Sequence, residues 1–276
     1  MTFSIVATDG SAVGVAVASR FLAVGSVVPG ARAGVGAVAT QSFAKASYIP
    51  DLLTALGQGE SAAAALARLT AADEGREERQ VGVVGLADQA TFTGSACMPW
   101  AGGVAGRHGP EAYAVQGNIL TGPEVVADME QAWLASVGRS FPQRLLVALA
   151  AGDAAGGDRR GRQAAAVYAQ RPGAGYDATG VLVDLRVDDH PNPVDELVRL
   201  LDLSELYFGE PEDVQPLTGD LADEVRTRLD AVGVVGGRLD ADLAAWAGEV
   251  NLETRLSADG IDARVLAQLR GASTEP

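Results

Sequence analysis

The sequence predicts an α+β protein in which antiparallel sheets are covered by helices, followed by a small all-helical unit. Near its start, apolar residues alternate strictly with polar or small ones, which is typical of half-buried strands. Along the chain, strands, a helix pair, strands, a second helix pair and further strands succeed one another. A linker containing Pro and Gly comes next, and every periodic segment beyond it is helical.

The chain opens with two predicted strands joined by a short turn. Residues 2–8 and 13–19 each alternate between two residue classes. Asp9-Gly10 lies between them and supplies residue types that tolerate a positive φ, so we expect a hairpin. A third strand is predicted at 34–40, after a turn at Pro29-Gly30.

Two helix pairs separate the remaining strands. The first pair is rich in Ala and covers 47–56 and 61–72, with Ser61 as the expected N-cap of its second helix. The second pair covers 123–136 and 142–151, and each of its helices has a Pro early in its first turn. Further strands are predicted between and after the pairs, at 80–86, 90–93, 112–115, 163–170 and 181–188.

The predicted domains are a main domain at 1–208, a linker at 209–218 and a helical unit at 219–276. A helix over 194–208 closes the main domain, and the linker reads GEPEDVQPLT. The last part carries three short helical segments, expected at 222–232, 239–250 and 262–269.

Composition argues against two classes of partner. The 276 residues carry a formal net charge of −15, which disfavours nucleic acid because a phosphate-binding surface needs clustered Lys and Arg. No apolar run approaches the ~20 residues that cross a bilayer, so we expect no membrane partner. The start lacks the basic and apolar regions of a secretory signal, and the chain has one cysteine, Cys97. Both features predict a cytoplasmic protein.

Thr2 is the first candidate for chemistry. A threonine hydroxyl is a weak nucleophile unless a base lies beside it, and a free α-amine on the same residue can be that base. Removal of Met1 would create this pair, and the pKa of an unperturbed α-amine is ~7.7 to 8.0, close to neutral pH. The alternative interpretation is that Thr2 is merely a small residue opening an edge strand.

Several stretches resemble a known bacterial family. TFSIVATDGSAVGVAVASR, ending in Ser19-Arg20, resembles the opening of an N-terminal nucleophile hydrolase. AVGSVVPGARAGVGAVATQS, VQGNILTGPEVVADM, GGDRRGRQAA and LVDLRVDDHPNPVDEL resemble the family known as domain of unknown function ten twenty-eight. This resemblance implies a four-layer αββα sandwich, with two antiparallel sheets between helix layers, and it favours Thr2 as the nucleophile.

The end of the chain resembles a small peptidoglycan-binding helical module. The residues that carry this likeness are LTGDLADEVRTRL, LAAWAGEVNLETRL and DGIDARVLAQLR. Similarity among small three-helix units is a weak guide to a ligand, so we interpret the module as a packing or dimerisation unit. The expected assembly is therefore a homo-oligomer, with a dimer as the simplest case.

Other residues are candidates to complete an amidase site around Thr2. An amide hydrolase needs donors aimed at the developing oxyanion, and VQGNIL offers the Gly117 N–H and the Asn118 side chain. Gln41, at the end of a predicted strand, is a candidate for orienting the substrate. Lys45 is a candidate for lowering a pKa near the threonine, with a solvated lysine as the alternative.

The loop GDAAGGDRRGRQ is the candidate site for a substrate anion. Its glycines would let the backbone approach a ligand, and Arg159 or Arg160 could bind a carboxylate through two hydrogen bonds. Asp158 and Arg20 are assigned to the same substrate-binding set. The alternative is a solvated connector in which Asp153 and Asp158 neutralise the arginines.

No cofactor and no metal are predicted. His190 follows Asp189, but one histidine with nearby acids is thin evidence for a metal, and the Asp-His-Pro-Asn-Pro stretch is interpreted as helix-capping. The leading function is an N-terminal-threonine amidohydrolase acting on a small amide, peptide-like, N-acyl or N-carbamoyl amino-acid substrate. The alternatives are a non-catalytic protein that binds an anionic metabolite at the Gly/Arg loop, and an assembly protein.

Overall fold

A computed structural model describes residues 2–272 and divides the chain into two units, Met1–Leu200 and Leu201–Pro276. The division falls inside helix α5 (Pro193–Phe208), upstream of the boundary expected at 208.

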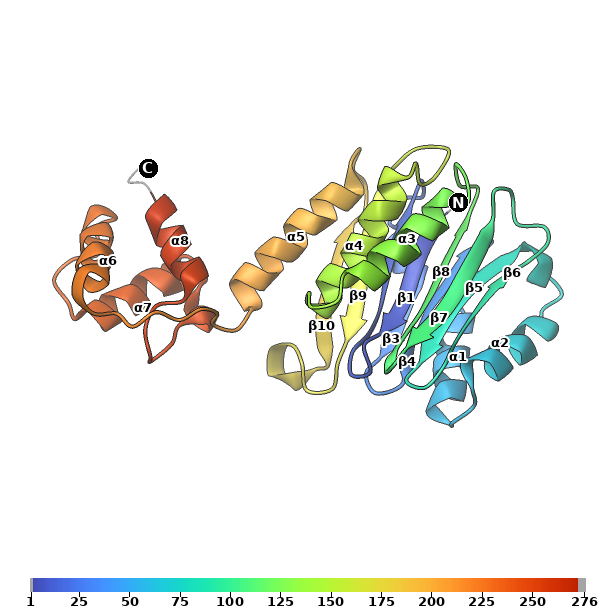
Figure 1. Cartoon of the computed structure of the whole chain (residues 1–276), viewed down its shortest axis with the longest axis horizontal. Helices are drawn as coiled ribbons and strands as arrows, with labels where there is room; N and C mark the ends of the chain where they lie inside the picture. Colours follow the sequence, from blue (N-terminus) through green and yellow to red (C-terminus); the bar gives the residue numbers. More distant parts are fainter. Residues whose placement is uncertain (1, 273–276) are drawn as a thin grey trace. The chain divides into compact units, whose positions relative to one another are not determined.

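Two antiparallel sheets form the centre of the first unit (Figure 1). The six strands of one sheet follow the order β10-β9-β2-β1-β8-β7 and the four strands of the other the order β3-β4-β5-β6. The six are β10 (Val181–Val187), β9 (Ala164–Gln170), β2 (Val13–Ser19), β1 (Thr2–Thr8), β8 (Glu111–Asn118) and β7 (Gly102–His108). The four are β3 (Pro29–Arg32), β4 (Gly36–Ser42), β5 (Arg79–Gly85) and β6 (Gln89–Thr93).

Helices cover the outer face of each sheet. Helices α1 (Tyr48–Gly57) and α2 (Ala62–Ala71) pack on the four-stranded sheet, and α3 (Glu124–Ala135) and α4 (Phe141–Ala154) pack on the six-stranded sheet (Figure 1). The four-layer αββα sandwich is therefore confirmed. The Ser61 hydroxyl accepts from Ala64 N–H, so the expected cap of α2 is also present.

Alternation along β1 and β2 explains how the two sheets meet. Val6 and Val15 are register partners, and both belong to a buried core cluster that also contains Ala39 and Val84 of the other sheet. Because side chains alternate across a strand, Thr2 and Ser4 lie on the same inward face as Val6. The intervening positions, Phe3 and Ile5, belong to the outward face of β1.

Two strands were not expected from the sequence, β3 and β7. Both are edge strands, and neither shows the alternation of apolar and polar residues that predicted the other strands. β3 starts at Pro29, which an edge strand tolerates since its missing N–H breaks no ladder. β7 is Gly-rich and partly exposed, and it pairs along β8. Two segments that the sequence pattern did not predict as strands thus complete one edge of each sheet.

The second unit is helical. It contains the end of α5 together with α6 (Gly219–Ala231), α7 (Leu239–Glu249) and α8 (Ala263–Gly271). Their apolar faces share a core that includes Val225, Leu243, Trp246 and Leu266. Short 3-10 helices complete the two units, at Val24–Ser26 (η1), Arg76–Glu78 (η2), Tyr176–Ala178 (η3) and Glu253–Arg255 (η4).

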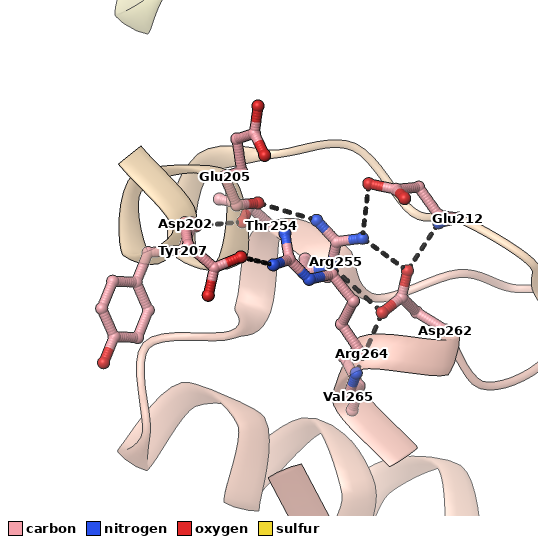
Figure 2. Close-up of polar contacts among 9 residues, drawn as sticks. All are labelled: Asp202, Glu205, Tyr207, Glu212, Thr254, Arg255, Asp262, Arg264 and Val265. Carbon is pink, nitrogen blue, oxygen red and sulfur yellow. Dashed lines mark hydrogen bonds and ion pairs between the residues drawn. The ribbon is translucent and has the colours of Figure 1, made fainter. Parts of the chain in front are cut away.

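A buried ion pair also holds the second unit together. Figure 2 shows the Arg255 guanidinium between Asp262, the Glu212 side chain and the Glu205 carbonyl. Arg255 and Asp262 are both fully buried, and Arg255 Nε and its terminal nitrogen donate to the two carboxylate oxygens at 3.0 and 2.9 Å. Asp262 also caps α8 by accepting from Val265 N–H.

Across residues 2–272, none of the helices has both the length and the apolar character needed to cross a membrane.

Candidate functional site

The inward face of the sandwich changes from apolar to polar at one end. Beyond the Val and Ala cluster, the inward positions of five strands carry hydroxyl and amide side chains. These positions are Thr2 and Ser4 of β1, Ser19 of β2, Gln41 of β4, Gln80 of β5, and Gln116 and Asn118 of β8. All seven residues are buried. A polar layer between two sheets is an unusual use of core positions, and buried polar groups of this kind need hydrogen-bond partners.

Thr2 is held by contacts to both of its oxygen atoms. Its Oγ1 lies 3.1 Å from Ser19 Oγ. Its backbone carbonyl accepts from Gln41 Nε2 at 3.1 Å and from Asn118 Nδ2 at a longer 3.5 Å. The predicted removal of Met1 concerns a residue outside the described ones. The structure thus brings together three residues selected from the sequence, Thr2, Gln41 and Asn118.

Gln80 organises this layer, although it is not among the residues selected from the sequence. Its Oε1 accepts from Gln41 Nε2 at 2.8 Å and from Asn118 Nδ2 at 2.9 Å. Its Nε2 donates to Gly117 O at 2.8 Å and to Thr93 Oγ1 at 2.9 Å. A signal was available, because Gln80 lies on the same face as Gly82 and Val84, and every residue that follows it in β5 is small or apolar.

Ser4 and Gln116 extend the layer away from Thr2. Ser4 Oγ donates to Gln41 Oε1 at 2.7 Å and accepts from Gln116 Nε2 at 2.6 Å. Gly82 faces Gln116 across the sheets, and a Cβ added at Gly82 would overlap the Gln116 amide. The glycine is therefore required by the close approach of this side chain.

Asn118 contacts Thr2 directly, and Gly117 precedes Asn118 in β8. Asn118 Nδ2 has two hydrogens, and its two acceptors are Thr2 O and Gln80 Oε1. Gly117 is opposite Phe3 of β1 and Gly102 of β7, within the sheet rather than at a free strand end. Its lack of a side chain leaves room for Leu120. In this arrangement Asn118 positions the threonine carbonyl.

A pocket of about 440 Å³ opens beside Thr2. Its lining is mostly apolar, with a few polar groups at one side. The apolar lining residues are Phe21, Val24, Val27, Val28, Phe43 and Ala44, and the polar ones are Thr2, Gln41, Ser42 and Arg79. Such a lining, apolar with convergent polar groups, is typical of small-molecule sites. Ser42 has a φ of 69° and Ala23 a φ of 53°, so left-handed backbone occurs in and next to the segments that form the pocket wall.

Arg79 is the cation of this pocket. Its Nε donates to Asp73 Oδ2 at 3.1 Å, and one terminal nitrogen donates to Phe43 O at 2.6 Å. Asp73 also accepts from the Tyr48 hydroxyl at 2.8 Å. Burial alone would raise the pKa of Asp73, but the hydrogen bonds from Tyr48, Arg79 and Gly75 N–H outweigh it and hold that pKa well below its usual range.

Lys45 belongs to the same charge cluster rather than to the pocket wall. Its Nζ lies 3.5 Å from Asp73 Oδ1 and 5.2 Å from the centre of the Tyr48 ring. The residues that line the pocket beside Thr2 do not include Lys45. Its contacts are with Asp73 and Tyr48 rather than with Thr2.

The Gly/Arg loop is tied to the start of the chain. Asp158 is buried, and its carboxylate accepts from the backbone N–H groups of Arg20 and Arg160, each at 2.8 Å. The Arg160 guanidinium pairs with the same carboxylate at 3.3 Å and also donates to Arg20 O. The Arg20 guanidinium in turn donates to Arg160 O. The acidic partner that the sequence offered as an alternative is therefore in contact with Arg160.

The other arginines of this loop differ in their partners. Arg162 pairs with Asp153 at 2.8 Å. Arg159 is exposed, and its backbone N–H donates to Ile119 O. Its side chain has no polar partner within residues 2–272. A small hollow of about 170 Å³ lies at this loop, beside Ser19 and the two acidic residues.

No group of three His, Cys, Asp or Glu side chains suited to a metal occurs within the described range 2–272. Cys97 is buried, and its thiol donates to Arg79 O at 3.3 Å, which fits a packed, hydrogen-bonded side chain.

Both units of the chain match known protein families. Residues 2–197 match the family described as "Family of unknown function (DUF1028)", and residues 207–269 match the one described as "Putative peptidoglycan binding domain". A search of curated proteins found no match. Among solved structures, the chain is similar to the crystal structure of protein SPO2555 from Silicibacter pomeroyi, assigned to DUF1028, with a TM-score of 0.66 and 31% sequence identity. That match covers 81% of this chain and 89% of the other. The chain therefore belongs to the family of unknown function DUF1028.

Proposed function

We propose that this protein is an N-terminal-threonine amidohydrolase that acts on a small amide. One observation carries the proposal: Thr2, the first described residue, lies in the wall of a pocket of about 440 Å³ and is fixed there by a buried polar network. A nucleophile must be held in one orientation beside the space where its substrate binds.

The composition of the network supports a functional interpretation. The inward faces of β1, β4, β5 and β8 carry Val and Ala toward one end of the sandwich. Toward Thr2, the inward faces of the same strands carry Ser, Gln and Asn. Buried amides add no apolar burial energy and must all be satisfied, so a sheet interface that needed only stability would use apolar residues. The amides near Thr2 serve positioning.

The proposed reaction is acyl transfer through Thr2. After loss of Met1, Thr2 Oγ1 attacks the amide carbonyl and its proton passes to the Thr2 α-amine. The carbon–nitrogen bond then breaks, and the departing amine takes that proton. Water attacks the resulting ester with the α-amine again as base, which releases the acid and regenerates the hydroxyl. Gln41, Asn118 and Ser19 hold Thr2 in place during these steps.

The test uses the processed protein and a panel of N-acyl, N-carbamoyl and peptide amides. We expect hydrolysis of at least one class, loss of hydrolysis in Thr2→Ala, and partial retention in Thr2→Ser, which keeps a hydroxyl beside the amine. Ser11→Ala, at an exposed turn of the first hairpin, is the matched control for removal of a hydroxyl. Equal activity of Thr2→Ala and the unaltered protein would exclude this mechanism.

A further inference from the structure

We propose that the amide substrate carries a free carboxylate, which binds Arg79, and an apolar acyl chain, which lies against Phe21 and Phe43. This inference rests on the proposed function, because it assigns the two ends of the substrate on either side of the bond that Thr2 would attack. The substrate class is thus an N-acyl amino acid or a closely related N-acyl acid.

Charge at the pocket is the first argument. The whole chain has a formal net charge of −15, yet none of the residues that line the pocket is acidic and Arg79 is its one charged lining residue. The adjoining cluster contains Arg79, Lys45 and a single carboxylate, Asp73, which leaves one positive charge uncompensated. A positive pocket in a strongly acidic protein favours an anionic ligand, since the rest of the surface repels it.

The hydrogen-bond state of Arg79 is the second argument. Asp73 holds Nε and Phe43 O holds one terminal nitrogen, so the guanidinium plane is fixed at the pocket wall. Within residues 2–272, none of the hydrogen bonds or ion pairs of Arg79 involves its other terminal nitrogen, which lies against Gly75. A fixed guanidinium that lines a pocket and keeps a donor unoccupied suits a carboxylate, because a hydrogen bond between two charged groups is short and strong.

The apolar wall is the third argument. Phe21 and Phe43 are 50% and 57% exposed although both line the pocket, and Val24 and Val28 behind them are buried. Exposed aromatic side chains at the mouth of a pocket gain from covering by an apolar group. The arrangement places an apolar surface and a cation around one nucleophile, which matches the two ends of an N-acyl amino acid.

The Gly/Arg loop is a poorer anion site because Asp153 and Asp158 both line its hollow, whereas no acidic residue lines the pocket beside Thr2. Its best placed guanidinium, Arg160, already shares the Asp158 carboxylate, so an added anion would meet a neutralised pair. Arg79 also contacts a carboxylate, but Lys45 contacts the same one and restores the positive balance.

The test compares two ligands of nearly equal size, N-octanoylglycine, which ends in a carboxylate, and N-octanoylglycinamide, which ends in a neutral amide. Binding is measured by calorimetry on full-length Thr2→Ala, which cannot turn the ligands over. We expect the carboxylate ligand to bind at least about tenfold more tightly, since a hydrogen bond to a charged group adds about that factor. Both ligands are measured on the same protein, so a difference between them reflects the ligand, and circular dichroism checks that Thr2→Ala is folded.

Two protein variants locate the effect. Arg79→Gln should remove the preference for the carboxylate. The control is Arg76→Gln, three residues before Arg79, where an exposed arginine pairs with Glu77; this variant should keep the preference. Phe43→Ala should weaken both ligands equally, because it removes apolar cover from the shared chain. Equal binding of the two ligands, or binding of neither, overturns the inference. Tight binding of the carboxylate ligand, together with a processed protein that hydrolyses no amide, instead overturns the proposed function and leaves the anion site in place.

Discussion

Asn118 Nδ2 donates to Gln80 Oε1 at 2.9 Å and thereby joins β8 of one sheet to β5 of the other, directly behind Thr2. Both side chains are buried, and the same Gln80 oxygen also accepts from Gln41. Two sheets that otherwise meet through small apolar side chains are thus fixed relative to each other by an amide cluster. The position of the Thr2 carbonyl depends on that cluster.

Removing Gln80 should impair both stability and activity. Gln80→Leu leaves the Gln41 and Asn118 amides without their shared acceptor, and each unsatisfied buried group costs about 1–3 kcal/mol. We expect the free energy of unfolding to fall by that order, and kcat to fall more than KM rises because Thr2 loses its orientation. Urea unfolding and steady-state kinetics measure the two effects. Gln58→Leu, at an exposed amide after α1, is the control and should leave both unchanged.

Gly82→Ala should destabilise the protein although the change adds only a methyl group. The new Cβ overlaps the Gln116 amide, which contacts Ser4 and cannot move without breaking that bond. Overpacking of this kind costs typically about 1–3 kcal/mol. Gly57→Ala is the matched control, since a Cβ there meets nothing closer than 3.8 Å and the position is the last of a helix. Equal unfolding midpoints for the two variants would contradict the close packing.

The buried ion pair of the C-terminal unit predicts an asymmetric response to charge removal. Arg255→Leu leaves Asp262 as an unpaired buried carboxylate, and breaking such a pair costs about 3–5 kcal/mol. Arg238→Leu removes an ion pair with Asp240 in which the arginine side chain is 84% exposed. This variant should change the free energy of unfolding little. Hydrogen exchange of α8 reports the effect within this unit. Similar protection of α8 in both variants would show that the buried pair adds nothing.

Asp73 predicts a pH-dependent contribution to stability. Its folded-state pKa lies below the unfolded value of ~3.9, so the carboxylate stabilises the fold above that pH and the effect declines as pH falls toward the folded pKa. Asp73→Asn should therefore be less stable than the unaltered protein at pH 7, by about 1–3 kcal/mol, and the gap should narrow at pH 3. Asp128→Asn, on the exposed side of α3, should show no such gap at either pH.

The sequence was a good guide to the strands that lie inside the sheets. β1 and β2 begin and end at the predicted residues, because both are buried along their length and alternation there is strict. β3 and β7 were missed because they contain the Pro and Gly that sequence patterns assign to turns, whereas the edge strands β6 and β10 contain neither and were predicted.

The residues of the candidate site were also predicted only in part. Thr2 was selected because loss of Met1 would place an α-amine beside its hydroxyl, and Gln41 and Asn118 were selected as polar residues at strand ends. Gln80 was missed because its importance arises from hydrogen bonds that only the fold creates, to Gln41 of the neighbouring strand and to Asn118 of the other sheet. Arg79 was missed because its partners, Asp73 and Phe43, lie outside its own strand. Lys45 is close in sequence to Gln41 but contacts Asp73 instead, since α1 begins shortly after it.

The most direct measurement is the intact mass of the protein isolated from its native cell. The account predicts a chain that begins at an unblocked Thr2, because only then does the hydroxyl in the pocket wall have an amine beside it to take its proton. A native chain that still carries Met1, or one whose Thr2 nitrogen is acylated, would contradict the proposed chemistry.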